Sequence, residues 1–238
     1  MAESCGHLAL RNVFAGPGSV TVLEDLSLDI LPGETVALLG RNGVGKTTLL
    51  ETLMGLCPAS SGVIELDGHS VRGWPTWRRS RCGLALVPQE REVFPSLSVV
   101  ENLLVAQRGD DWTVERAFDL FPKLAQRKLH RGNELSGGEQ QMLAIARALM
   151  GSPDVLLLDE PLEGLAPIIV HSLLEAFHRL RQETGMTMLL VEQHAEVALD
   201  FAARSVVLVR GRVAFDGQSR DLRADPDHMA CLLGVSGG

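Results

Sequence analysis

The sequence lacks the patterns that mark a zinc site, a disulfide framework or a nucleic-acid surface. Its four cysteines lie far apart without a CxxC pair, and its seven histidines show no HExxH or similar ligand spacing. These spacings argue against a structural zinc site and a disulfide framework, so we expect reduced thiols. Acidic residues outnumber basic ones by 30 to 22, and the net charge of −8 disfavours nucleic acid as a partner, because such binding neutralises phosphates.

Long apolar runs and a leader pattern are missing as well. Hydrophobic residues make up 45% of the chain, yet no run reaches the roughly 20 residues that cross a bilayer. The N-terminus also lacks the basic and then apolar pattern of a signal peptide. We expect the protein to stay where it is made and any membrane role to come through a partner. Without repeats or low-complexity tracts, we interpret 1–238 as a single domain.

Short apolar runs alternate with helical patterns along the chain. We predict strands at 20–23, 26–30, 35–39, 63–66, 83–87, 155–158, 187–191, 206–209 and 213–215, and helices at 46–54, 101–129 and 168–183. Buried strands that alternate with helices indicate a parallel α/β sheet. The first strands indicate a small antiparallel β subdomain beside it, and the polar helical stretch indicates a helical subdomain inserted at about 90–135.

The strongest motif is a glycine-rich loop that follows the 35–39 strand and precedes a helix. Residues 40–47 fit G-x-x-x-x-G-K-[ST], and we take the nucleotide-binding residues here to be Gly40, Arg41, Asn42, Gly43, Val44, Gly45, Lys46, Thr47 and Thr48. Glycines let backbone N–H groups turn toward phosphate oxygens, and the helix N-terminus adds positive charge. We expect Lys46 to bind the β- and γ-phosphates and the Thr47 hydroxyl to bind magnesium. A chance match is expected in only about 1% of chains of this length.

A pair of carboxylates follows the apolar 155–158 strand. Open α/β sheets place their ligands at the carboxyl ends of strands, which is where Asp159 and Glu160 stand. Successive strand residues point to opposite faces, so the two acids are expected to have different roles. Asp159 suits magnesium, and Glu160 suits polarising an attacking water as a general base. The alternative is a pair of acids that caps a strand at the surface.

A third motif stands at the start of a helical pattern. It reads Leu135-Ser136-Gly137-Gly138-Glu139-Gln140-Gln141 and is followed by apolar residues at helical spacing. A serine and two glycines at a helix start form a second possible anion-binding end, for which we take Ser136, Gly137 and Gly138. For the tripeptide alone, a simple N-cap serine is the better interpretation.

The three motifs together resemble those of the ATP-binding-cassette ATPases, and the resemblance covers nearly the whole chain. The string LSGGEQQ from Leu135 is similar to the family signature, Gln89 to its Q-loop glutamine, and residues 159–160 to its Walker B pair. The resemblance implies an α/β P-loop NTPase core that hydrolyses ATP and uses Mg²⁺. Gln89 would be catalytic, would join Thr47 and Asp159 around the magnesium, and would link the site to the helical subdomain and a transmembrane permease.

In this family two ATPase subunits pack head to tail, and each ATP lies between the P-loop of one subunit and the signature of the other. The resemblance therefore implies that Ser136 and Gly138 act on the partner's γ-phosphate. ATP binding would close the pair and hydrolysis would open it. Whether the second ATPase subunit is identical or homologous is left open.

A narrower resemblance concerns the cargo. The strings PQEREVFP at 88–95, EGLAP at 163–167 and VEQH at 191–194 are similar to strings typical of importers for branched-chain amino acids, and of the related urea and amide importers. This chain looks like the shorter ATPase subunit of such an importer. The resemblance implies permease subunits, an indirect periplasmic or extracellular substrate-binding protein, and a peripheral position on the cytoplasmic face of the inner membrane.

Three positions depart from the family pattern. The chain has no tyrosine, and the position of the aromatic residue that stacks on adenine falls near Pro17, so Phe14 is the candidate substitute or else a core residue. The switch histidine aligns best with Gln193, although His194 is one residue later, and we keep His194 as a catalytic candidate with Gln193 as its rival. Leu162 replaces a small polar residue, and we expect it to pack at the dimer seam.

Other classes of protein fit less well. A cassette ATPase of DNA repair or translation would carry coiled coils or a second cassette, and it would not need a permease. A P-loop phosphotransferase would need neither the signature nor the loop at Gln89. An exporter subunit is disfavoured by the importer-like strings.

Overall fold

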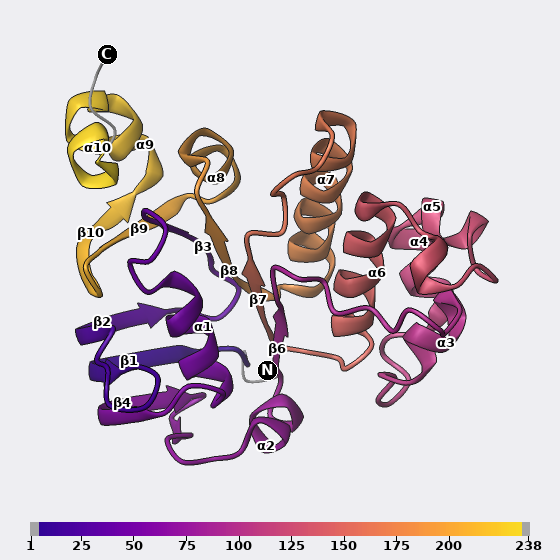
Figure 1. Cartoon of the computed structure of the whole chain (residues 1–238), viewed down its shortest axis with the longest axis horizontal. Coiled ribbons are helices and arrows are strands. Elements are labelled where there is room, and N and C mark those ends of the chain that lie inside the picture. Colours follow the sequence, from indigo (N-terminus) through magenta and orange to yellow (C-terminus); the bar gives the residue numbers. More distant parts are fainter. Residues whose placement is uncertain (1–4, 235–238) are drawn as a thin grey trace.

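A computed structural model describes residues 5–234 and shows two sheets (Figure 1). The strand order is β2-β1-β4-β5 in the smaller sheet and β10-β9-β3-β8-β7-β6 in the larger. The strands are β1 (Leu8–Ala15), β2 (Leu23–Ile30), β3 (Thr35–Leu39), β4 (Ala59–Leu66), β5 (His69–Ser70), β6 (Leu84–Val87), β7 (Val155–Asp159), β8 (Thr187–Glu192), β9 (Arg204–Val209) and β10 (Arg212–Gln218).

Helices connect the strands and cover the larger sheet. They are α1 (Lys46–Met54), α2 (Thr76–Arg81), α3 (Val99–Leu104), α4 (Val114–Leu120), α5 (Pro122–Gln126), the 3₁₀ turn η1 (Gly132–Glu134), α6 (Gly137–Leu149), α7 (Pro167–Thr184), α8 (Ala195–Phe201), α9 (Ser219–Ala224) and α10 (Pro226–Leu233). Figure 1 places α3, α4 and α5 at one end of the molecule, away from the antiparallel strands. The mixed α/β fold expected from the sequence is confirmed.

The larger sheet is parallel except at its edge. Strands β9, β3, β8, β7 and β6 run parallel to one another, and only β10 pairs antiparallel, with β9. Such a sheet is buried on both faces, which explains why every residue of β3, β7 and β8 is buried. Alternate residues of β3 enter different clusters: Ala37 and Leu39 face the core shared with α6 and α7, whereas Val36 and Leu38 face α1 and the antiparallel sheet.

The antiparallel sheet contains a strand that the sequence pattern did not reveal. β1 pairs with both β2 and β4, so it is the centre of that sheet. The strand predicted at 20–23 is wrong, because those residues are mostly loop and β2 begins at Leu23. Irregular register along β1 hides the alternation that reveals a strand, since buried and exposed positions do not follow a strict period of two.

The predicted helix at 101–129 is broken into shorter helices. A loop with a left-handed Gly109 separates α3 from α4, and Pro122 begins α5 directly after α4 ends. Ser98 starts α3 with a reciprocal capping box to Glu101. These helices occupy the stretch assigned to the inserted subdomain, whose boundaries at about 90–135 stay a prediction.

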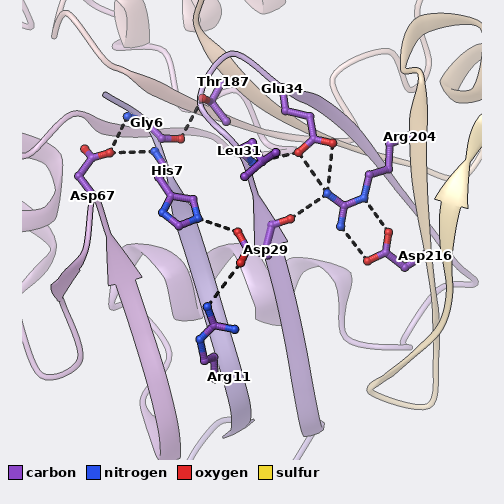
Figure 2. A network of polar contacts seen from close by, with 10 residues as sticks. All are labelled: Gly6, His7, Arg11, Asp29, Leu31, Glu34, Asp67, Thr187, Arg204 and Asp216. Carbon is purple, nitrogen blue, oxygen red and sulfur yellow. Dashed lines mark hydrogen bonds and ion pairs between the residues drawn. The ribbon is translucent and has the colours of Figure 1, made fainter. Parts of the chain in front are cut away.

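A polar network ties the two sheets together around Arg204 of β9 (Figure 2). One Arg204 nitrogen, Nη1, donates to the carbonyl of Asp29 at 2.8 Å and to the Glu34 carboxylate at 3.1 Å. Its Nε and Nη2 donate to the two oxygens of Asp216, both at 2.7 Å. The fork geometry of the guanidinium thus joins the end of β2, the turn before β3, and β10.

A second part of the network fixes the N-terminal segment against the larger sheet. The hydroxyl of Thr187, at the start of β8, donates to the Gly6 carbonyl and accepts from the Gly33 N–H, both at 2.9 Å. The carboxylate of Asp67 accepts from the backbone N–H groups of Gly6 and His7 at 2.8 Å (Figure 2). Residues from four strands (β2, β8, β9 and β10) and from three connecting segments are therefore held in one network.

We predict that Arg204→Gln lowers the free energy of unfolding by about 2 kcal/mol, because four charge-assisted contacts of a side chain that is only 20% exposed are lost. The control is Arg212→Gln, whose ion pair with Glu24 joins side chains that are about half exposed, and which should cost less than about 0.5 kcal/mol. Urea denaturation measures both, and equal losses would contradict a special role for the junction.

Candidate functional site

The glycine-rich loop connects β3 to α1 in a conformation that requires glycine at two positions. Gly40 and Gly45 have φ values of 155° and 108°. A Cβ atom on Gly45 would lie 2.9 Å from a methyl group of Leu23, and one on Gly40 would lie 2.7 Å from the Leu208 carbonyl oxygen. The loop is therefore packed against β2 and β9, and side chains at these two positions would be strained as well as too close to their neighbours.

The loop forms one wall of an open cavity of about 400 Å³. This volume falls in the range of small-molecule sites. The cavity is lined by Val22, Asn42, Gly43, Gly45, Lys46, Thr47, Thr48, Gln89, Glu160, Glu163 and Gln193. The structure thus brings together most of the loop, the expected Q-loop glutamine and one of the two expected carboxylates, although β3, β6, β7 and β8 carry them from distant parts of the sequence.

Lys46 is the buried cation of the site. Its side chain is 5% exposed, and its Nζ donates to the carbonyls of Gly40 at 2.8 Å and Arg41 at 3.3 Å. Nζ also lies 3.3 Å from Oε1 of Glu160, whose side chain is 7% exposed. The Lys46 Nζ is thus held between two carbonyl oxygens of the loop and the Glu160 carboxylate.

Glu160 follows β7 in a backbone conformation that is unusual for its residue type. Its φ of 46° lies in the left-handed region, and its N–H donates to the Val191 carbonyl at 3.0 Å. Such strain clusters at functional sites. The turn directs the Glu160 carboxylate to Lys46, while Asp159 remains the last strand residue, so the two acids take different positions as expected.

Asp159 has the environment of a cation ligand. It is 3% exposed, and its Oδ1 atom has no hydrogen-bond partner. Burial raises the pKa of Asp159 to about 6, a hydrogen bond from Thr47 opposes the shift, and the neighbouring Glu160 adds to it. An unpartnered buried carboxylate oxygen beside a threonine hydroxyl fits a hard cation such as Mg²⁺.

Two glutamine side chains donate hydrogen bonds to carboxylates that line the cavity. The Nε2 of Gln89 donates to Oε2 of Glu163 at 2.5 Å, and the side-chain amide of Gln193 donates to Oε2 of Glu160. His194 is exposed, is absent from this cavity and instead lines a separate one near Met229. The structure therefore places Gln193, the rival of His194, at the position facing the predicted base.

The signature residues lie elsewhere on the chain. Ser136 begins α6 with a capping box, in which its Oγ bonds to Glu139, and neither it nor the two glycines line the cavity. This arrangement is compatible with action on a partner's nucleotide, which stays a prediction. Glu192, at the end of β8, is 1% exposed, and burial raises its pKa to about 7 while the hydrogen bond from the Leu162 N–H opposes the shift.

The remaining expectations meet different outcomes. Phe14 is half-buried in β1 opposite Ser61 and does not line the cavity, where Val22 is found instead. The expectation that Leu162 packs at a dimer seam is wrong, because its side chain is 7% exposed and belongs to the core of its own chain. Sequence reasoning missed Val22, Glu163 and Glu192, whose importance depends on contacts between segments that are distant in sequence.

Comparisons with known proteins agree with this geometry. The family model of the ABC transporter matches residues 23–163. The high-affinity branched-chain amino acid transport ATP-binding protein BraG of Pseudomonas aeruginosa is 44% identical over 91% of this chain and 95% of its own length. LivF of Archaeoglobus fulgidus, named as a probable branched-chain amino acid transport ATP-binding protein, is 38% identical over 93% of this chain and 96% of its own.

A solved structure shows the same architecture. The dimeric post-hydrolysis state of an ATP-binding cassette bound to ADP and Pi superposes with a TM-score of 0.79 and 26% identity, over 90% of this chain and 99% of that one. The expected fold and family are thereby confirmed. The chain belongs to the ABC transporter family, as an ATP-hydrolysing subunit of a transporter.

Proposed function

We propose that this chain energises an importer of branched-chain amino acids. The observation that carries the ATPase part is the single cavity that joins Lys46, Gln89 and Glu160. The cargo is supported by the similarity to BraG and LivF over nearly their whole lengths, together with the importer-like strings in the sequence.

The glycine-rich loop would hold the phosphates of ATP. Asn42, Gly43 and residues 45–48 line the cavity at the N-terminus of α1, where negative charge is favoured. Lys46 would leave the Glu160 carboxylate and the Gly40 carbonyl to bind the γ-phosphate, because a phosphate group carries more negative charge than either of them. Val22 supplies an apolar contact at the rim of the cavity.

Thr47, Gln89 and Asp159 would hold Mg²⁺. The unpartnered Oδ1 of Asp159 is the atom that supports this assignment most directly. Bound there, the ion would neutralise charge on the β- and γ-phosphates.

Glu160 would act as the general base. Its carboxylate accepts a proton from a water, and the water oxygen forms a bond to the γ-phosphorus while the bond from that phosphorus to the β-phosphate oxygen breaks. The products are ADP and phosphate. Gln193 donates to one Glu160 oxygen and leaves the other, now paired with Lys46, to face the cavity once the lysine moves to the nucleotide.

A second ATPase subunit would complete the site. Ser136 and Gly138 lie outside their own cavity, so their proposed contact with a γ-phosphate must involve another chain. In the described residues no helix is long and apolar enough to span a bilayer. We infer that the chain associates peripherally with permease subunits, on the cytoplasmic face of the inner membrane, and that a substrate-binding protein acts indirectly through them.

Replacement of Glu160 tests its proposed role as the general base. Glu160→Gln should lower the rate of ATP hydrolysis at least about 100-fold, because the amide cannot accept the proton of water. ATP with Mg²⁺ should then trap a dimer, observed by size-exclusion chromatography. Glu175→Gln, which changes an exposed carboxylate on α7, is the matched control and should retain normal hydrolysis. Undiminished hydrolysis by Glu160→Gln would refute the assignment.

The second prediction separates the two candidates for the switch residue. Gln193→Ala should lower kcat by about 10-fold, because Glu160 loses the amide that orients it. His194→Ala should change kcat less than about twofold, since His194 is exposed outside the cavity. Steady-state kinetics of both variants give the answer, and the reverse order of effects would restore His194 as the switch residue.

The third prediction concerns the cargo. In vesicles that contain the complete transporter, leucine, isoleucine or valine with the binding protein should stimulate ATP hydrolysis several-fold. Urea and short-chain amides at the same concentration should not. Stimulation by urea or acetamide alone would replace the proposed cargo with the related importer class and leave the ATPase assignment intact.

A further inference from the structure

Glu192 is a buried carboxyl group that the proposed mechanism does not use. It is the last residue of β8, it is 1% exposed, and it does not line the nucleotide cavity. The five residues before it in β8 are buried, and four of them are apolar. An apolar side chain would continue this pattern, so a carboxyl group here needs a reason.

The contacts of Glu192 connect two backbone segments. Its Oε1 accepts from the Leu162 N–H at 3.3 Å, and Glu192 directly precedes Gln193 in the chain. Leu162 stands two residues after Glu160, and Gln193 is the residue whose side chain bonds to the Glu160 carboxylate. One buried carboxyl group therefore ties the turn that follows the predicted base to the end of β8.

The electrostatic surroundings oppose the placement of this group. Glu160 and Glu163 are the charged groups that act on Glu192, and both repel a negative charge there. A side chain chosen only for packing would avoid a buried site beside two acids. The hydrogen bond from the Leu162 N–H is the gain that offsets part of this cost.

We propose that Glu192 is a positioning residue that holds the 160–163 turn and the Gln193 backbone at a fixed separation, and thereby sets the orientation of Glu160. The inference rests on the proposed role of Glu160 as the base. It extends to Gln89 as well, because Gln89 bonds to Glu163 at the end of the same turn. Through the turn, one buried carboxyl group positions both acids that face the cavity.

The kinetic test compares Glu192→Leu and Glu192→Gln with the wild-type protein, all as full-length chains. Glu192→Leu fills the site but accepts no hydrogen bond, and it should lower kcat about 10- to 100-fold. The dissociation constant of ATP, measured by calorimetry, should change less than about twofold, because Lys46 and the loop are untouched. Glu192→Gln keeps one accepting oxygen and should recover most of kcat. Glu196→Gln, an exposed neighbour on α8, is the matched control and should behave as wild type.

Amide hydrogen exchange provides a readout that does not depend on hydrolysis. Glu192→Leu should speed exchange of the Leu162 amide in the 160–163 turn, and leave α1 unchanged. Normal exchange in that turn would overturn the proposal, whatever the activity. Faster exchange with an unchanged kcat, or a loss of ATP affinity equal to the loss of kcat, would also overturn it. If Glu160→Gln keeps its activity, the base assignment fails separately, while the exchange data still decide whether Glu192 holds the turn.

Discussion

The parallel pairing of β3, β8, β7 and β6 is the constraint on which the site depends. In register, Leu39 pairs with Glu192, Asp159 with Val191, and Val87 with Leu158, so these strands end at one edge of the sheet. Burial on both faces demands apolar residues along each strand, and polar residues begin only where the strands stop. The polar residues that follow these strands are therefore brought together by the pairing of the strands, although they are far apart in the sequence.

The same burial concentrates charge of one sign. Among the described side chains buried at this edge of the sheet, Lys46 is paired with Glu160, and the carboxyl groups of Asp159 and Glu192 are buried beside that pair. Low dielectric surroundings and mutual repulsion explain why the pKa values of Asp159 and Glu192 are raised. An excess of buried carboxyl groups is costly in the absence of a cation, and this is the electrostatic reason that the site suits a nucleotide accompanied by a divalent ion.

How far the sequence predicted the molecule depends on the range of the interactions involved. The glycine-rich loop, the Asp159–Glu160 pair and the buried parallel strands are local patterns, and the predicted fold and family are confirmed. β1 was not predicted, because its irregular register breaks the alternation of buried and exposed residues. The helix predicted at 101–129 was too long because the mixture of polar and apolar residues that suggested a helix continues through the loop that separates α3 from α4.

The site shows the same division. Lys46, Gln89 and Glu160 line one cavity, because each belongs to a motif attached to a strand end, and their roles stay predictions. The sequence left the choice between Gln193 and His194 open, because a shift of one position after β8 changes which side chain points to Glu160. In the structure it is Gln193. Leu162 was misplaced for a related reason: a position in a turn does not reveal which side of the turn is covered by the core.

The left-handed backbone of Glu160 sets two kinds of selection against each other. A φ of 46° is one that glycine adopts at no steric cost, whereas a residue with a Cβ atom pays about 1 kcal/mol to do so. Selection for stability alone would favour glycine at this position, whereas the proposed role as general base requires a carboxylate. With that role, the turn would be a compromise in which stability and activity favour different residues.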